Sequence, residues 1–262
     1  MQQSREKPLA PLPPIAVVGR GRVGTALARS AAANGVELTQ AGRDDLDERL
    51  RSAEVALLCV PDAEIAAACA SAVAVGPRLR FVGHTSGATT LAALADAADA
   101  GIATFSLHPL QTVPDGEADL VGSPAAVAGS GEEALRLAWS LATTLGLTPF
   151  EVPEESRAAY HAAASMASNF LVAREESAAE LLASAGVEDA RGLLAPLVLR
   201  TAANWAERGE VALTGPIARG DEETVAAHLE ALVREAPELE PLYRALAERT
   251  ASLAAGRAGA TR

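Results

Sequence analysis

The chain has 262 residues, a formal net charge of −12 and a hydrophobic fraction of 49%, with aromatic residues at only 3%. This length is typical of one large or two modest domains, whose core alanine, leucine and valine must largely fill. The negative charge argues against nucleic acid or an anionic membrane as the main partner. No Cys/His spacing typical of a metal site is present in the sequence.

The first residues bear on cellular location. Prolines at positions 8, 11, 13 and 14 interrupt the apolar stretch that a signal peptide needs, and the sequence has no apolar run long enough to span a membrane. We therefore predict a flexible leader over residues 1–13 and a cytoplasmic protein. Cys59 and Cys69 lie in apolar or helix-like runs, which favours buried thiols in a reducing compartment.

A glycine motif follows the first apolar run, residues 15–18, which is typical of a buried parallel strand. Gly19 permits a tight turn, Gly21 lets the backbone approach a pyrophosphate, and Gly24 lets a helix pack closely on the strand. The first amides of that helix would then point at the phosphates. We predict a dinucleotide site formed by Gly19, Arg20, Gly21, Arg22, Val23 and Gly24.

Short apolar runs alternate with alanine-rich helical stretches as far as residue 153. Strands are predicted at 15–18, 36–41, 55–60, 80–84, 103–107, 124–128 and 148–152. Helices are predicted at 23–34, 45–52, 62–75, 89–100 and 131–145. Strands that alternate with helices predict an α/β domain over residues 14–153, with a doubly wound, mostly parallel Rossmann sheet.

The pattern changes after Pro153, where no convincing strand occurs. Helices are predicted at 154–185, 187–208, 221–236 and 238–255. Gly186, Gly209 and Pro237 separate them, as expected for residues that end helices. We therefore predict an all-helical domain over residues 154–255 and a frayed tail over residues 256–262.

The end of the second predicted strand bears on the choice of cofactor. NAD-specific domains place an acidic residue there to bind the ribose 2′-hydroxyl. In this chain Gly42 leaves room and Arg43 offers a planar cation suited to a 2′-phosphate, which favours NADP. NAD stays an alternative, because Asp44 lies one residue beyond the usual acid and Arg43 also suits a solvated loop. Val60 and Pro61 follow the third predicted strand and are expected to line the same cofactor.

Two predicted strand ends carry histidines. His84 precedes a run of small polar groups that includes Ser86, and His108 is followed by Pro109. Open α/β sheets bind ligands outside the carboxyl ends of their strands. A histidine held there suits proton transfer near neutral pH, so His108 is a candidate catalytic residue. His84 competes for this role, and a purely structural role is open for both.

The first helix after residue 153 carries polar residues in an alanine-rich context. His161, Ser165 and Asn169 follow one another at i, i+4 and i+8 and share one face of a continuous helix. Such a stripe suits either a substrate cleft or a hydrogen-bonded interface. Further along, Arg219 suits either the binding of a carboxylate or the fixing of its loop, and Asp221 is expected to cap the next helix.

Several motifs occur together in this chain: Gly19-x-Gly21-x-x-Gly24, Cys59-Val60-Pro61-Asp62, His84-Thr85-Ser86-Gly87, His108-Pro109-Leu110-Gln111-Thr112 and Leu213-Thr214-Gly215-Pro216-x-x-Arg219-Gly220-Asp221. In this order, over about residues 14–250, they resemble a bacterial family that pairs a Rossmann-like domain with a C-terminal domain of unknown function. That family is similar to the 6-phosphogluconate dehydrogenase superfamily, which includes ketopantoate reductase, pyrroline-5-carboxylate reductase and prephenate dehydrogenase.

The resemblance implies NAD(P)-dependent oxidoreduction and a homodimer formed through the helical domain. Ketopantoate reductases and hydroxyacid dehydrogenases carry Lys-x-x-x-Asn on the first long helix after the Rossmann domain. Asn169 matches the asparagine, whereas Ser165 stands at the lysine position, so the general acid of those enzymes is missing. In prephenate dehydrogenases a serine and a His-Pro pair after successive strands contact the substrate. Ser86 and His108 resemble this pair, which implies acid/base chemistry for His108 and an orienting role for Ser86.

These observations favour an NADP-dependent oxidoreductase that transfers hydride between nicotinamide and a small carbonyl, hydroxyl or imine substrate. His161, Ser165 and Arg219 are its candidate substrate-binding residues, and Asn169 a further catalytic candidate. Members of the resembled family are often encoded near pantothenate-synthesis genes, which makes a ketopantoate-like 2-oxo acid a candidate substrate. The alternative is a non-catalytic dinucleotide-binding regulator or scaffold, which the missing lysine favours.

Overall fold

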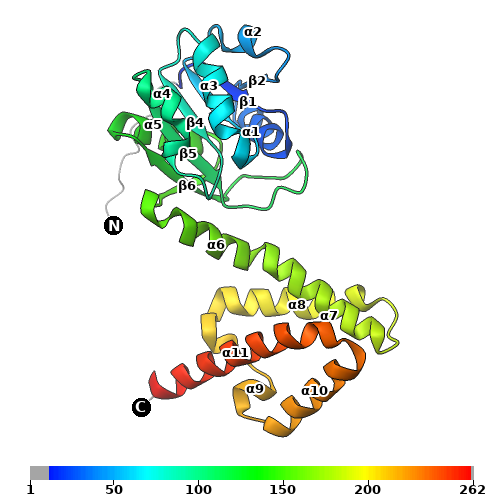
Figure 1. Cartoon of the computed structure of the whole chain (residues 1–262). Coiled ribbons are helices and arrows are strands. Elements are labelled where there is room, and N and C mark those ends of the chain that lie inside the picture. The colour runs from blue at the N-terminus through cyan, green and yellow to red at the C-terminus, as the bar shows by residue number, and fades with distance from the viewer. Residues whose placement is uncertain (1–11, 261–262) are drawn as a thin grey trace. The chain divides into compact units, whose positions relative to one another are not determined.

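A computed structural model describes residues 12–260, with side chains described for residues 12–256. The chain divides into two compact units, residues up to Met166 and residues from Ala167 (Figure 1). The predicted boundary at residue 153 lies where the last strand ends, but the first unit keeps the helix that follows. Residues 1–11 of the predicted leader lie outside the described residues. None of the helices between residues 12 and 260 has the length and apolarity that a membrane crossing needs.

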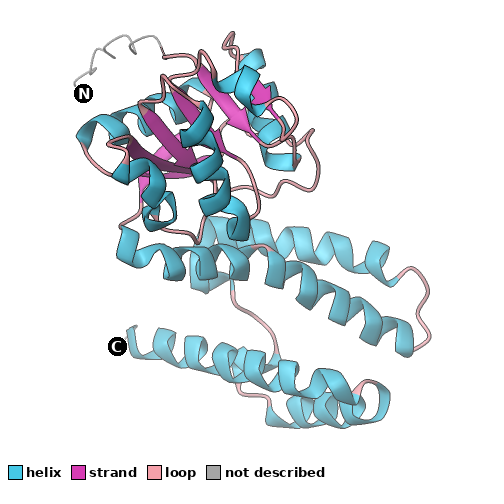
Figure 2. Cartoon of the chain, turned by 45° about the horizontal axis from the view of Figure 1, so that its top comes forward, coloured by secondary structure: helices cyan, strands magenta, loops and turns pink. Residues whose placement is uncertain are grey.

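The first unit is built on a seven-stranded sheet with the order β2-β1-β3-β4-β5-β6-β7. Figure 2 draws the strands of this sheet in magenta, with helices packed around them. The strands are β1 (Ile15–Val18), β2 (Thr39–Ala41), β3 (Val55–Leu58), β4 (Phe81–His84), β5 (Ala103–Pro109), β6 (Pro124–Gly129) and β7 (Thr148–Glu151). All neighbouring pairs are parallel except β5 and β6, which are antiparallel. The predicted mostly parallel α/β sheet is therefore confirmed.

Helices cover both faces of this sheet. The helices of the first unit are α1 (Arg22–Ala33), α2 (Leu46–Leu50), α3 (Ile65–Val75), α4 (Ala95–Asp99), α5 (Glu132–Thr144) and α6 (Arg157–Ala167). One buried cluster joins the sheet to α1 and α5, and a second joins its other face to α2, α3 and α4. Successive residues of β1 belong to opposite clusters, with Val17 in the first and Val18 in the second. This arrangement is the predicted double winding.

Small residues allow the core to close around its few large side chains. The ring of Phe105 on β5 is fully buried and occupies the space beside Gly83 on β4. A Cβ on Gly83 would lie only 2.5 Å from Cζ of Phe105. Cys59 and Cys69 are free and buried, as the sequence predicts.

The second unit is helical throughout the described residues, as predicted. Its helices are α7 (Asn169–Ser184), α8 (Ala190–Arg208), α9 (Pro216–Arg219), α10 (Glu222–Glu235) and α11 (Glu240–Ala260). The predicted tail from residue 256 differs, because α11 continues to Ala260. The single helix predicted over 154–185 is wrong. Ser168, with φ of −120° and ψ of −74°, leaves the helical conformation and separates α6 from α7.

Candidate active site

The predicted glycine motif forms a tight turn between β1 and α1. Gly19 has a φ of +121°, and its amide donates a hydrogen bond to the carbonyl of Ala41 at 2.9 Å. A Cβ on Gly19 would lie 2.3 Å from the carbonyl oxygen of Cys59, and a Cβ on Gly24 would lie 2.2 Å from that of Gly19. A Cβ on Gly21 would meet nothing within 4 Å. Packing therefore requires the outer two glycines, while Gly21 leaves open space beside the backbone.

The N-terminus of α1 suits an anionic group. Gly21 is its N-cap, no side chain caps it, and its first turn contains no acidic residue. The first amides of a helix carry a partial positive charge and bind phosphates in this setting. The strand order places β2 and β3 on opposite sides of β1, which makes the carboxyl end of β1 the topological switch point where such sheets bind ligands. These residues therefore fit the pyrophosphate of a dinucleotide.

The predicted NADP determinant lies in a loop with several ion pairs. Arg20 folds toward this loop and pairs with Asp44 at 3.3 Å and with Asp45. The amide of Gly42 donates to Asp45 at 2.7 Å, and this hydrogen bond holds the pKa of that carboxyl below its usual range. Arg43 is 91% exposed and pairs with Glu64 at 2.7 Å. An exposed ion pair of this kind contributes little, so Arg43 is available for a 2′-phosphate.

The remaining predicted cofactor residues adjoin the switch point. Val60 and Pro61 follow β3 after one intervening residue, Cys59. Val23 on the first turn of α1 packs against the core. Arg22 extends from the same turn to the carbonyl of Pro114, at 3.5 Å. Among the described residues, no group of three or more His, Cys, Asp or Glu side chains is placed to hold a metal ion.

His108 lies near the end of β5 and contacts two side chains of α6. Its Nδ1 is 2.7 Å from the hydroxyl oxygen of Tyr160. The ring of His161 lies edge-on, with a centroid distance of 6.2 Å. A Cβ on Gly87 would lie 2.8 Å from the nearest atom of either imidazole. The structure therefore brings His108 and His161 together, and it adds Tyr160, which the sequence did not identify.

Burial determines the protonation states of His108 and Tyr160. It lowers the pKa of His108 to about 4, and neighbouring His161 and Arg157 act in the same direction. Burial also raises the pKa of Tyr160 to about 12. Both side chains are therefore neutral at pH 7. The proton between them occupies either the tyrosine oxygen or Nδ1, which leaves Nε2 of His108 as a donor or an acceptor, respectively.

His84 and Ser86 have mainly internal contacts. His84 is fully buried, its Nδ1 accepts a hydrogen bond from the Ser86 amide at 3.2 Å, and burial lowers its pKa to about 4. The hydroxyl oxygen of Ser86 accepts hydrogen bonds from the amides of Ala88 (3.2 Å) and Thr89 (3.0 Å). The same hydroxyl donates to Thr89 Oγ1 at 2.9 Å. These bonds use the hydrogen and both lone pairs of Ser86, which makes it a loop-holding residue in this conformation.

A buried arginine fixes the start of α6. Arg157 is only 1% exposed, and its Nε pairs with Glu154 at 2.7 Å. Its Nη1 donates to the carbonyl of Ser86 at 3.1 Å, and its Nη2 donates to the hydroxyl of Ser106. Glu154 also accepts a hydrogen bond from the Leu91 amide at 2.7 Å. One guanidinium thus ties the start of α6 to β5 and to the loop that follows β4.

The other predicted substrate residues are divided between the two units. Ser165 lies on α6 in the first unit, whereas Asn169 begins α7 in the second. The predicted stripe on one continuous helix is therefore wrong, because the chain breaks at Ser168. Arg219 ends α9 in the second unit. The predicted cap is confirmed, since Asp221 accepts a hydrogen bond from the Thr224 amide at 3.1 Å.

The sequence analysis did not identify Arg157 and Tyr160 as residues of the site around His108. Arg157 and Tyr160 stand three residues apart on α6, so they project from the same side of the helix toward the sheet. The only available signal was an arginine at the start of an alanine-rich helix with a tyrosine one turn later. That pattern is common on exposed helices. It indicates a site only once α6 is seen to pack against β5 and the loop after β4.

The glycine turn and the strand order define a Rossmann-like α/β fold, and a helical unit follows it in the chain. Residues 123–250 match the family model DUF2520, a domain of unknown function. The match begins at the start of β6 and extends through the helical unit, which confirms the predicted pairing of a Rossmann-like domain with a C-terminal domain of unknown function. None of the curated proteins compared with the chain matches it significantly.

Solved structures support the same fold. A candidate NADP oxidoreductase from Bacteroides fragilis is 22% identical, with a TM-score of 0.75 over 92% of this chain and 98% of that one. A protein from Thermotoga maritima is 21% identical, with a TM-score of 0.72 over 93% and 99% of the two chains. A pyrroline carboxylate reductase from Plasmodium falciparum, solved with NADP bound, is 11% identical, with a TM-score of 0.61 over 92% and 98%.

Proposed function

We propose that this protein is an NADP-dependent oxidoreductase that acts on a small carbonyl, hydroxyl or imine compound. The observation that carries the proposal is the glycine turn. Packing leaves no space for a side chain at Gly19 or Gly24, while Gly21 and the uncapped start of α1 leave room for a pyrophosphate. When bound, the nicotinamide would supply or accept a hydride. Arg43, freed from its exposed pair with Glu64, would bind the 2′-phosphate.

His108 would bind the reacting oxygen or nitrogen through Nε2. Because its pKa is about 4, the imidazole is neutral at pH 7. With Tyr160 as the donor to Nδ1, Nε2 carries a hydrogen and polarises a carbonyl or imine. With the opposite tautomer, Nε2 accepts the proton of a hydroxyl group. The Tyr160 hydroxyl can donate or accept, so it is compatible with both roles of His108, and both use a neutral ring.

The chemistry around His108 favours an uncharged reacting group. The cation that acts most directly on His108 is Arg157, and its guanidinium is already bound by Glu154, Ser86 and Ser106. A substrate carboxylate, as in a ketopantoate-like 2-oxo acid, would need another cation. We assign that role to Arg219, whose side chain is exposed at the end of α9.

Cofactor turnover tests this proposal directly. We expect NADPH to bind and to be oxidised by at least one member of a panel of 2-oxo acids, semialdehydes and cyclic imines. Arg219→Ala should raise KM for the acidic substrates alone, because an uncharged cyclic imine has no carboxylate to bind. Tight NADPH binding without turnover on any member of the panel would contradict an oxidoreductase.

The second candidate is a dinucleotide-binding regulator without turnover. It is favoured by the resemblance noted in the sequence, which places Ser165 at the position of the lysine in Lys-x-x-x-Asn. A regulator should show NADPH-dependent binding of a macromolecular partner or a change of assembly state, and it should tolerate His108→Ala without effect. The enzyme hypothesis predicts the opposite response to that substitution.

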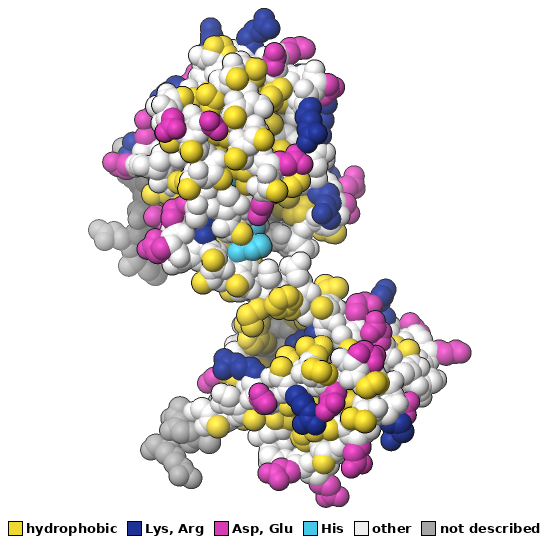
Figure 3. All heavy atoms as spheres, in the orientation of Figure 1, with side chains coloured by type: hydrophobic (Ala, Val, Ile, Leu, Met, Phe, Trp, Pro, Cys, Tyr) yellow, Lys and Arg dark blue, Asp and Glu magenta, His cyan; other side chains and the backbone are white. Residues whose placement is uncertain are grey.

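We further propose that the protein is a homodimer formed through the helical unit. Among the described residues of this unit, only Ala190, Leu232 and Ala236 are buried apolar residues. Large apolar side chains are instead 59–71% exposed on α7 and α8: Phe170, Val172, Leu193, Leu197, Leu199 and Trp205. Apolar side chains, in yellow, also gather on the visible surface of this unit (Figure 3). A second copy would cover them and supply the missing core.

Light scattering after size-exclusion chromatography tests the dimer. We expect twice the chain mass for the parent protein and a shift toward the monomer for Leu197→Asp, because a charge on α8 opposes burial of that face. Ala251→Asp on α11 places the same charge at another exposed position of the unit. This control should leave the mass unchanged. A parent protein of single chain mass at micromolar concentration would exclude the dimer.

A further inference from the structure

Asp62 is an acidic residue at the carboxyl edge of the sheet that the function proposed above does not use. It begins the short helical turn between β3 and α3, and its side chain is exposed. Across β3, β4 and β5, the residues Leu58, His84 and Ser106 lie in register. Because these strands are parallel, the loop that carries Asp62 leaves the sheet at the edge where β5 presents His108.

The charge of Asp62 has no compensating cation. In the part of the chain that the structure describes, no hydrogen bond or ion pair involves its side chain, and it does not cap the turn that it begins. Glu154, a second carboxylate that acts on His84, is bound by Arg157 at 2.7 Å. Burial lowers the pKa values of His84 and His108 to about 4, and the negative charge of Asp62 opposes this shift in both. An uncompensated carboxylate therefore acts on a neutral His108.

We propose that Asp62 binds a positively charged nitrogen of the substrate, which makes a small imine the substrate class of this site. This inference rests on the oxidoreductase function proposed above and narrows its substrate. An uncharged imine takes up a proton from water beside the carboxylate and becomes an iminium ion. Its carbon then accepts a hydride with its electron pair, and the π electrons of the C=N bond become the lone pair of the nitrogen. The imine is reduced to an amine, and the nicotinamide is oxidised.

The neutral pair of His108 and Tyr160 fits this step. With Nδ1 of His108 as the donor to the oxygen of Tyr160, Nε2 accepts a hydrogen bond from the N–H of the iminium ion. Neither side chain has to lose a proton. Reduction of a carbonyl would instead create an alkoxide near Asp62, and it would need a proton donor. His108 is already neutral at pH 7, and the sequence has a single lysine, Lys7. The site therefore suits an imine better than a carbonyl.

Binding of an amine that does not react tests the role of Asp62 separately from turnover. Pyrrolidine is a cation at pH 7 and has the shape of a reduced cyclic imine, whereas cyclopentanol is an uncharged analogue. Both are titrated by calorimetry into the protein saturated with NADP⁺. Asp62→Asn should weaken pyrrolidine binding by about tenfold or more, because the charged partner is lost, and leave cyclopentanol binding unchanged. An equal response of the two ligands would overturn the proposal.

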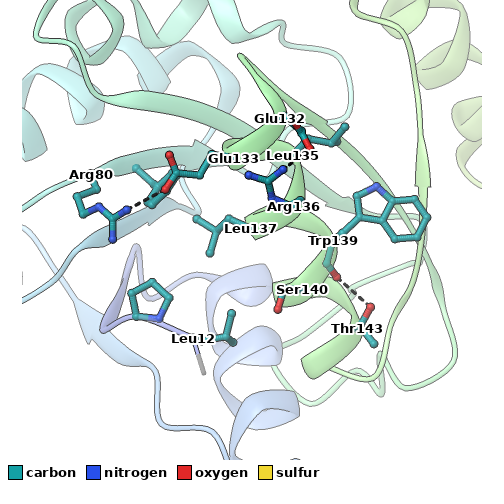
Figure 4. Close-up of a pocket in the computed structure, with 12 residues that line it drawn as sticks. Leu12, Arg80, Glu132, Glu133, Leu135, Arg136, Leu137, Trp139, Ser140 and Thr143 are labelled. Atoms are coloured by element: carbon teal, nitrogen blue, oxygen red, sulfur yellow. Dashed lines mark hydrogen bonds and ion pairs between the residues drawn. The ribbon is translucent and has the colours of Figure 1, made fainter. Parts of the chain in front are cut away.

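Turnover provides the second test, with 1-pyrroline and cyclopentanone as substrates of similar shape. The ratio of their kcat/KM values should favour 1-pyrroline in the parent and fall by about tenfold or more in Asp62→Asn. Glu133→Gln is the matched control, because it removes a carboxylate from a separate hollow of about 770 Å³ along α5, where Glu133 pairs with Arg80 at 2.8 Å (Figure 4). This hollow is lined by neither Asp62 nor His108, so the control should keep the parental ratio.

The remaining outcomes separate this inference from the proposed function. A parent that reduces cyclopentanone but not 1-pyrroline would overturn the imine and leave the oxidoreductase intact. Weaker NADPH binding in Asp62→Asn with an unchanged ratio would also overturn the proposal, in favour of a contact between Asp62 and the cofactor. If the parent turns over no member of the substrate panel, the oxidoreductase is contradicted, and the pyrrolidine titration still decides whether Asp62 binds a cationic nitrogen.

Discussion

The hydroxyl oxygen of Tyr160 lies 2.7 Å from Nδ1 of His108, although 52 residues separate the two in the chain. One residue comes from β5 and the other from α6, whose start is held by the buried guanidinium of Arg157. The orientation of the imidazole is therefore set by α6, the helix that carries both neighbouring rings, Tyr160 and His161. One ring nitrogen of His108, Nδ1, is thus held by a hydrogen bond, as in catalytic histidines that react through the other nitrogen.

Removal of His108 should abolish most of the turnover and spare cofactor binding. A positioned acid or base contributes about 10²–10⁴-fold in rate, so we expect His108→Ala to lower kcat by that range with NADPH affinity unchanged. Tyr160→Phe keeps the ring and should give a smaller loss with a shifted pH profile of kcat. The matched control is His228→Ala, which breaks a similar histidine–tyrosine contact of 2.8 Å with Tyr243 in the second unit. Turnover of His108→Ala within a few-fold of the parent would exclude the assignment.

Two glycines of the turn should respond differently to alanine. Gly21→Ala adds a Cβ to open space and should leave the melting temperature unchanged, but it should weaken NADPH binding, because that space is needed by the phosphates. Gly24→Ala places a Cβ 2.2 Å from the carbonyl of Gly19 and should destabilise the fold by about 1–3 kcal/mol, typical of overpacking. Thermal melts and fluorescence titration with NADPH measure both effects. Unchanged NADPH affinity in Gly21→Ala would place the phosphates elsewhere.

The choice of cofactor should depend on Arg43. Arg43→Ala should weaken NADPH binding far more than NADH binding, because only NADPH carries the 2′-phosphate. Glu64→Gln is the matched variant, because Glu64 is the ion-pair partner of Arg43. It frees Arg43 from its 2.7 Å ion pair and should tighten NADPH binding modestly. If both cofactors lose equal affinity in Arg43→Ala, the residue does not contact the phosphate.

Acid should destabilise the fold through its buried histidines. Burial lowers the pKa of His84 to about 4 in the folded protein, with Arg157 adding to the effect, whereas the unfolded chain titrates near 6.5. The unfolded state therefore binds more protons between these values, and stability falls as the pH drops from about 6.5 to 4. For His84 alone the loss is of the order of 3 kcal/mol, and His108 acts in the same direction.

Urea unfolding at pH 7.5 and pH 5 measures this effect. His84→Gln should lose part of the difference between the two midpoints, since glutamine does not titrate. His228→Gln removes a histidine from the second unit instead and should keep the full difference. Asp45 and Asp221, whose pKa values are lowered by hydrogen bonds, act only at lower pH. A parent midpoint that does not change between pH 7.5 and 5 would contradict the buried neutral histidines.

The sequence predicted the part of the site that depends on local rules. The turn at Gly19, Gly21 and Gly24 is specified by backbone sterics over six residues, and the structure reproduces it. The reversal of β6 could not be predicted, because an apolar run has no direction until its neighbour is known. The break at Ser168 was hidden for a related reason, since alanine-rich segments on both sides favour helix equally.

The contact between His108 and Tyr160 was beyond sequence analysis for a different reason. It requires α6 to pack on the sheet, and that packing depends on Arg157, whose partners Ser86 and Ser106 come from two other segments. No local pattern encodes a contact of one residue with two partners so far away in the chain. A neighbouring residue on α6 was nevertheless identified, because His161 is a polar residue in an alanine-rich helix.

The contact between Gly83 and Phe105 has a consequence for evolution. The two positions share one volume, since a Cβ on residue 83 would lie 2.5 Å from the phenylalanine ring. A larger residue at 83 is tolerated only with a smaller one at 105, so homologous sequences should vary at these positions together. His84 and Ser106 are the next residues along the two strands. Joint substitution of residues 83 and 105 would therefore change the spacing between β4 and β5 in homologues. The distance between His84 and Ser106 would change with it, although neither strand would lose its sequence of apolar residues.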